Sequence, residues 1–174
     1  MLDAPLELCD VRKIVDPDDP RVTIGAVSED GVRYLDHAQI AKLWPSVVDL
    51  AIERATIAVR HSSDLLRDGP PVSLQHRDVI LVDDGAVSLS EIRAAARSLQ
   101  ARDPRTLVLA LPVADPSIVD RLRIDFDRIV CLESEPILGS VGSRYRDFAP
   151  VSDAEVAALL QDAHRAHPEP ARGI

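Results

Sequence analysis

The chain has 174 residues, of which 46% are hydrophobic and 28% charged, and this composition fits one globular domain with a core of its own. Its formal net charge of -9 argues against nucleic acid or an anionic membrane surface as the main partner. No apolar run approaches the roughly 20 residues that cross a bilayer, so we expect no membrane span.

The first part of the chain predicts a strand, a hairpin and a long helix. Leu6–Val15 has the composition of a strand, and Arg21–Leu35 reads as a β-hairpin because residues 29–31 supply turn chemistry between two β-branched arms. Apolar residues then recur at helical spacing from about Pro45 to Arg67, with proline in the first turn and a Gly-Pro-Pro segment after the end.

From residue 79 onward, strand patterns alternate with helix patterns. The strands are expected at Val79–Val82, Thr106–Leu111 and Arg128–Leu132, and helices are expected to begin near Leu89, at Asp115-Pro116 and at Ser152. Ser152 and Glu155 form a capping-box pattern, with the last helix reaching about His164. This alternation predicts an α/β fold with a parallel sheet. Near-continuous apolar strands further predict a sheet buried on both faces.

One segment carries most of the functional information, and it reads VILVDDGAVSLSE from residue 79 to 91. The apolar strand delivers two adjacent carboxylates, Asp83 and Asp84, to a glycine turn that leads into a helix. Open α/β sheets present groups to phosphorylated ligands from this position, at the carboxyl end of a strand and the start of a helix.

This segment resembles the signature of the type I phosphoribosyltransferases, in which a hydrophobic strand and an Asp-Asp pair precede a Gly- and Thr-rich loop. Further stretches resemble a bacterial subgroup of that family, in an order and spacing that fit over about residues 8–160; they are DVRK at 10–13, IGAV at 24–27, LALPV at 109–113, VCLE at 130–133 and YRDF at 145–148. The resemblance implies a phosphoribosyltransferase-like parallel sheet flanked by helices, with an N-terminal β-hairpin, as a single domain over residues 1–167. A flexible tail is expected at 168–174.

The resemblance also implies roles for residues. Asp83 and Asp84 would be the catalytic pair, contacting the ribose hydroxyls of phosphoribosyl pyrophosphate (PRPP) and holding Mg2+ through water or through PRPP, since Mg2+ prefers oxygen ligands. The other substrate-binding residues implied are Arg12 and Lys13 for the pyrophosphate, Gly85, Ser88 and Ser90 for the 5'-phosphate, and Tyr145 for the acceptor.

The phosphate loop departs from the family pattern at two positions. Leu89 stands in place of a glycine, and its side chain blocks the close backbone approach that glycine allows. Glu91 stands in place of a threonine, and a carboxylate about 4 Å from a phosphate repels it by roughly 4 kcal/mol at an effective dielectric near 20. A purely structural interpretation of the same residues is a capping box, in which Ser88 caps the helix and Glu91 reaches back.

A second departure concerns the front of the domain. Family members begin with a helix, a strand and a glycine-rich pyrophosphate loop, and the printed sequence begins at about the strand that follows this unit. Loss of a strand would leave unpaired sheet edges. A truncated or split reading frame, a partner chain or homodimer that completes the sheet, and a rebuilt sheet without catalysis remain open as explanations.

The resemblance and the departures from it imply two candidate functions. The first is a Mg2+-dependent phosphoribosyltransferase, a glycosyltransferase of nucleotide metabolism that transfers a phosphoribosyl group from PRPP to a nitrogenous acceptor, with reduced or lost activity. The alternative is a non-catalytic relative, a pseudoenzyme that keeps the fold as a binding or regulatory module for PRPP or another phosphorylated small molecule. Since Met1 to Asp10 contains acids and no basic region typical of a signal peptide, we expect a cytoplasmic protein.

Overall fold

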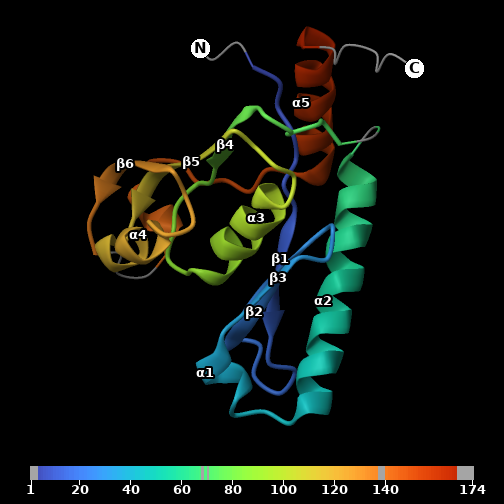
Figure 1. The fold of residues 1–174 in the computed structure, drawn as a ribbon, viewed down its shortest axis with the longest axis vertical. Helices are drawn as coiled ribbons and strands as arrows, with labels where there is room; N and C mark the ends of the chain where they lie inside the picture. The colour runs from blue at the N-terminus through green and yellow to red at the C-terminus, as the bar shows by residue number, and fades with distance from the viewer. Residues whose placement is uncertain (1–3, 68, 70, 137–139, 168–174) are drawn as a thin grey trace.

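The computed structural model describes residues 4–67, 69, 71–136 and 140–167, and it contains two three-stranded sheets with a helix between them (Figure 1). The strands are β1 (Val11–Val15), β2 (Thr23–Ser28), β3 (Arg33–Leu35), β4 (Asp78–Val82), β5 (Thr106–Ala114) and β6 (Arg128–Ser134). The helices are α1 (His37–Ile40), α2 (Pro45–Leu66), α3 (Ser90–Gln100), α4 (Pro116–Leu122), η1 (Val141–Arg144) and α5 (Asp153–Ala166). The expected tail at 168–174 lies outside the described residues.

The first sheet is antiparallel, in the order β1-β2-β3. The predicted hairpin is confirmed as β2 and β3, and Gly31 takes a positive φ of 86° in its turn. The strand predicted at Leu6–Val15 is shorter than expected, because only Val11–Val15 finds a pairing partner on β2.

The long helix α2 covers this sheet (Figure 1). Ala51, Ala55 and Val59 recur every four residues and are buried against Ile14 and the rest of the first core cluster. Pro45 occupies the first helical turn, where its missing N–H leaves no hydrogen bond unmade, so the predicted helix is confirmed almost to the residue. The short helix α1 was not predicted, although Asp36 caps it by accepting from the N–H groups of residues 38 and 39.

The second sheet is parallel, in the order β4-β5-β6, as the alternating pattern predicted. Leu107, Leu109 and Leu111 point from β5 into the second core cluster, where side chains of α3 and α4 meet them. The expectation of a sheet buried on both faces is wrong. Alternate residues of β4 and β6 are exposed, because both crossover helices pack on one face of the sheet.

The helix α3 joins the two halves of the fold. It contacts β1, β2 and β3 on one side and β5 on the other (Figure 1). Tyr34 of β3 lies beneath two arginines of α3, with the guanidinium carbons of Arg93 and Arg97 at 5.3 and 5.1 Å from the ring centroid. Arg93 also forms an ion pair with Asp125, at 3.0 Å from Nε to Oδ2.

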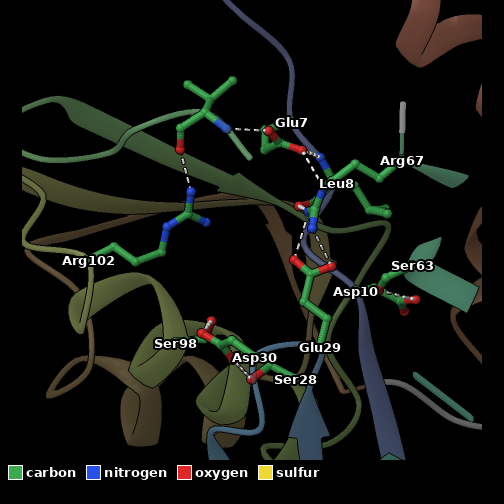
Figure 2. A network of polar contacts seen from close by, with 11 residues as sticks. Glu7, Leu8, Asp10, Ser28, Glu29, Asp30, Ser63, Arg67, Ser98 and Arg102 are labelled. Carbon is green, nitrogen blue, oxygen red and sulfur yellow. Dashed lines mark hydrogen bonds and ion pairs between the residues drawn. The ribbon is translucent and has the colours of Figure 1, made fainter. Parts of the chain in front are cut away.

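A network of partly buried polar side chains fixes the N-terminal segment against α2 and the hairpin (Figure 2). Arg67 follows α2 and donates to the carboxylates of Glu29 and Glu7 and to the carbonyl oxygen of Leu8. The Glu7 carboxylate also accepts from the N–H of Val72 at 2.8 Å. In the same figure, Asp30 of the hairpin turn accepts from the Ser98 hydroxyl of α3 at 2.7 Å, which ties the turn to that helix.

The last helix, α5, begins with the predicted capping box. The Ser152 hydroxyl accepts from the Glu155 N–H, and the Glu155 carboxylate accepts from the Ser152 N–H at 2.8 Å. Figure 1 shows α5 beside the upper end of α2, which it contacts. Among the described residues, no helix combines the length and apolar character needed to cross a bilayer.

Candidate functional site

The acidic turn lies where the parallel sheet ends. β4 pairs with β5 as far as Val82. Directly after this pairing, the Asp83 N–H donates to the Ala110 carbonyl oxygen at 3.3 Å. The chain stays beside β5 as far as Ala86, since the Ala86 N–H donates to the Val113 carbonyl oxygen at 3.1 Å. The two carboxylates are therefore held at the carboxyl edge of the sheet, the edge at which open α/β sheets bind ligands.

The two carboxylates differ in environment. Asp84 is exposed, whereas Asp83 is half-buried and its Oδ1 accepts from the Gly85 N–H at 3.3 Å. Burial and then the adjacent Asp84 carboxylate raise the pKa of Asp83 to about 6, against the lowering effect of the hydrogen bond from Gly85. The raised pKa lets Asp83 keep a proton at higher pH than a free carboxyl group, and two adjacent carboxylates can also bind a hard cation.

Gly85 permits a close approach at this turn. Its φ is 155°, and a Cβ atom at this position would lie 2.7 Å from Cγ1 of Val141 and 3.0 Å from the Val113 carbonyl oxygen. Any side chain would therefore push η1 away from the end of β5. The retained glycine keeps the segment from Ser140 onward packed over the acidic turn.

Tyr145 follows η1 and contacts the turn directly. Its hydroxyl donates to the Asp84 carbonyl oxygen at 2.6 Å, and its ring lies 5.0 Å from the ring of Phe148, tilted by 43°. Partial desolvation raises the pKa of Tyr145, and the charges of Asp84 and Asp83 raise it further, so the hydroxyl stays protonated as a donor. The residue predicted for the acceptor side thus lies at the acidic pair.

The predicted basic pair is divided between two faces of the first sheet. Successive side chains of a strand point in opposite directions. Arg12 shares its face with the buried Ile14, on the side that α2 covers. Lys13 points the other way, toward α3, and its Nζ lies 3.3 Å from Oε2 of Glu91. This lysine is thus paired with the residue that departs from the family pattern.

The start of α3 differs from the predicted capping box. The helix begins at Ser90, and the capping position is taken by Leu89, whose side chain is buried and makes no capping hydrogen bond. The capping-box interpretation is wrong because Glu91 turns to Lys13 instead of reaching back to Ser88. Ser88, two residues before the first residue of α3, is half-buried, and Ser90, that first residue, is buried.

Comparisons with known proteins give this geometry a context. No family model matches the chain. Two curated proteins of Mycobacterium tuberculosis, from strains CDC 1551 / Oshkosh and ATCC 25618 / H37Rv, are each named as a putative phosphoribosyl transferase, and each is 34% identical to this chain over 167 residues. The match covers 94% of this chain and 38% of each relative, so the chain spans well under half the length of these relatives.

One solved structure is similar to this chain in both fold and sequence. The crystal structure of TT1426 from Thermus thermophilus superposes with a TM-score of 0.73 at 31% identity, covering 91% of this chain and 76% of that chain. Over most of its length the chain is therefore similar to proteins named as putative phosphoribosyl transferases and to TT1426. The α/β fold inferred from the sequence, with its parallel sheet and N-terminal hairpin, is confirmed. The names of the relatives support the resemblance to phosphoribosyltransferases.

The resemblance to phosphoribosyltransferases implies Mg2+, and the donor set of the turn is compatible with it. Asp83 and Asp84 provide hard carboxylate oxygens, which suit this cation. Among the described residues, no group of three or more His, Cys, Asp or Glu side chains could hold a metal ion. The acidic turn therefore fits Mg2+ only if water or a ligand phosphate supplies the remaining ligands.

Two contacts at the acidic turn and at the start of α3 could not be found by sequence reasoning. The Tyr145 hydroxyl reaches a backbone carbonyl, and the spacing of side chains gives no signal for such a contact. The Lys13–Glu91 ion pair joins β1 to the start of α3, two segments that are far apart along the chain. One indication of this ion pair was present in the sequence, which is the carboxylate of Glu91 in place of a threonine. A carboxylate at this position attracts a nearby cation.

Proposed function

We propose that the chain binds PRPP, or another phosphorylated small molecule, at the carboxyl end of β4. We further propose that its transfer of a phosphoribosyl group to a nitrogenous acceptor is weak or lost. The observation that carries the proposal is the acidic turn, in which the half-buried Asp83 and the exposed Asp84 lie under the Tyr145 hydroxyl. Similarity to proteins named as putative phosphoribosyl transferases supports the same ligand class.

In this proposal the chain acts by positioning and by charge. Asp83 and Asp84 would contact the ribose hydroxyls, and the N–H groups of the turn and the helix start would face the 5'-phosphate. Mg2+, when bound with the ligand, would neutralise the charge of the pyrophosphate leaving group. Tyr145 would hold the Asp84 backbone in place through its 2.6 Å hydrogen bond and would limit access of water to the acidic pair.

The reduced activity in the proposal rests on Lys13. Its contact with Glu91 at 3.3 Å already neutralises the cation that the family pattern would place against pyrophosphate. An incoming phosphate would have to break this pair and then lie near the carboxylate left behind. Repulsion of like charges at about 4 Å amounts to roughly 4 kcal/mol at an effective dielectric near 20.

The same ion pair favours a second candidate function. Because Glu91 neutralises Lys13, the chain is suited to a non-catalytic binding role. In this role it would bind a ligand with less phosphate charge and, when the ligand is bound, would regulate a partner protein. This candidate shares the acidic turn with the first and differs in the absence of turnover.

Calorimetric titration with PRPP, with and without Mg2+, tests the proposal. Binding that requires Mg2+ and is lost in Asp84→Asn is the expected result, and binding that is unchanged in this variant would place the ligand elsewhere. An assay of pyrophosphate release with a panel of nucleobases then separates the two candidates. No heat at millimolar PRPP would overturn the proposal, and rapid turnover would overturn the claim of weak or lost transfer.

A further inference from the structure

The long helix α2 carries a second apolar stripe, on the side away from the core. Its buried residues recur every four positions, and its main contacts are with β1, β2 and α5. Leu50, Ile57 and Leu65 lie on the other side, where they are 41%, 63% and 63% exposed. At about 100° per residue, the three side chains fall within roughly 80° of one another around the helix axis. We call these three residues the outer stripe.

The outer stripe gives α2 apolar residues on two sides. A surface helix of a globular protein usually places polar residues opposite its buried side. Here α2 forms the right-hand edge of the molecule in Figure 1, so the outer stripe faces away from both sheets. An apolar stripe in this position indicates a contact with another polypeptide.

The spacing of the outer stripe makes it complementary to itself. If two α2 helices lie antiparallel about a two-fold axis at Ile57, this residue meets its own copy on the axis. Leu50, seven residues before Ile57, then meets Leu65 of the second copy, eight residues after it. A two-fold interface uses the same patch on both partners, so each helix must offer an apolar side chain where the other does. The outer stripe fulfils this condition in its three layers.

The charges beside the outer stripe match in the same arrangement. Glu53 and Arg60 follow Leu50 and Ile57 by three residues each, so they share one flank of the stripe, and both are exposed. The antiparallel pairing brings Glu53 of each copy to within one residue, about 1.5 Å along the axis, of Arg60 of the other. A parallel pairing would leave the two charges about 10 Å apart along the axis. Among the contacts within the described residues, neither side chain has an ion-pair partner.

The size of the contact sets its strength. A helix of 22 residues offers a strip about 33 Å long and 10 Å wide, well under the roughly 800 Å2 per partner of a stable interface. At each end the pairing also brings Asp49 to the level of Asp64 of the second copy, and these like charges repel. The association is therefore a weak equilibrium between monomer and dimer.

We propose that the outer stripe of α2 is the interface of a weak antiparallel dimer of this chain. The occupant of the stripe is a second copy, because both the apolar layers and the charges of its flank are complementary to themselves about Ile57. This inference does not rest on the proposed function, since it uses no residue of the acidic turn.

Sedimentation velocity of the purified chain, from about 5 to 500 µM, tests the proposal. We expect a dimer whose fraction rises with concentration. Ile57→Glu places two carboxylates at the axis and should weaken the dimer about tenfold or more. Ile124→Glu is the matched control, since this residue is 85% exposed and follows α4, outside α2. It should leave the dimer unchanged, and thermal melts should show that both variants fold.

A charge reversal tests the flank of the stripe. Glu53→Arg faces Arg60 of the second copy with a like charge and should weaken the dimer several-fold. The double variant Glu53→Arg with Arg60→Glu restores opposite charges, so it should recover the parent affinity. Failure of the double variant to recover it would overturn the antiparallel arrangement.

Disulfide cross-linking tests the direction of the two helices. In the antiparallel arrangement Ile57→Cys should cross-link on mild oxidation, whereas Leu50→Cys should not, because its two copies lie about 20 Å apart. The parent chain, with Cys9 and Cys131, sets the background. Equal cross-linking of both variants would show a parallel pairing and would overturn the proposal. A chain that is monomeric at about 500 µM, or a dimer that is unchanged in Ile57→Glu, would also overturn it.

Discussion

Nζ of Lys13 lies 3.3 Å from Oε2 of Glu91, so the cation expected to face pyrophosphate is paired with the carboxylate that replaces a family threonine. Both side chains are substantially exposed, at 46% and 36%. Such a pair contributes little to stability, typically about 0–1 kcal/mol. Its main effect is therefore on the electrostatic potential that an anionic ligand meets at the start of α3.

Replacing Glu91 by threonine should strengthen ligand binding. The variant Glu91→Thr removes a negative charge from the phosphate region and frees Lys13, so we expect the affinity for PRPP to rise about tenfold or more in the presence of Mg2+. Calorimetric titration measures the change. Glu53→Gln, a loss of charge on the exposed side of α2, is the matched control and should alter affinity little. Equal gains in both variants would show that net charge alone is responsible.

Much of the fold was predictable because local patterns and tertiary packing agree. The long helix α2 follows a periodic apolar stripe, and the parallel sheet follows the alternation of strands and helices. The exposure of one face of β4 and β6 was not predictable in the same way. Apolar strands such as Val79–Val82 look the same in sequence whether a face is covered or open, since the cover is not part of the strand.

The site was predictable in position but not in its contacts. The strand that ends in Asp83 and Asp84 has a local signature, and the sheet places both residues at its carboxyl edge. The capping box at Ser88 was expected from the same kind of local reasoning, and it failed because Lys13, from the other sheet, competes for the Glu91 carboxylate. Local sequence cannot show which of two partners, one near and one distant, a charged side chain takes.

Arg67 should be essential for stability. Its guanidinium is 14% exposed and contacts Glu29 and Glu7, each 15% exposed, so Arg67→Ala leaves two carboxylates without their cation. We expect the free energy of unfolding to fall by about 3–5 kcal/mol in urea denaturation. Arg54→Ala, on the exposed part of α2, should change it by less than about 0.5 kcal/mol. A loss below about 1 kcal/mol in Arg67→Ala would mean that the network in Figure 2 is relaxed in solution.

Asp83 should give stability a distinct pH dependence. Its pKa is raised from 3.8 to about 6 in the folded chain, so its protonated form favours folding. This contribution is full below about pH 4 and is lost as the pH rises through about 6. Asp83→Asn should therefore raise the free energy of unfolding at pH 8, by about 1–2 kcal/mol given partial exposure, and leave it nearly unchanged at pH 4. Asp49→Asn, on the exposed part of α2, is the matched control for the loss of one carboxylate. Parallel pH profiles for the parent chain and Asp83→Asn would contradict the raised pKa.

The Tyr145 hydroxyl should protect the acidic turn from opening. Tyr145→Phe removes the donor to the Asp84 carbonyl oxygen while keeping the ring against Phe148, so the turn loses one hydrogen bond of about 0.5–1.5 kcal/mol. We expect amide hydrogen exchange at Gly85 and Ala86 to become about three- to tenfold faster, with little change in global stability. Tyr34→Phe is the matched control, because its hydroxyl accepts from Arg93 at 3.3 Å, away from the turn. If both variants leave exchange at the turn unchanged, the η1 segment is held over Asp84 by the packing of Val141 on Gly85 rather than by the hydroxyl.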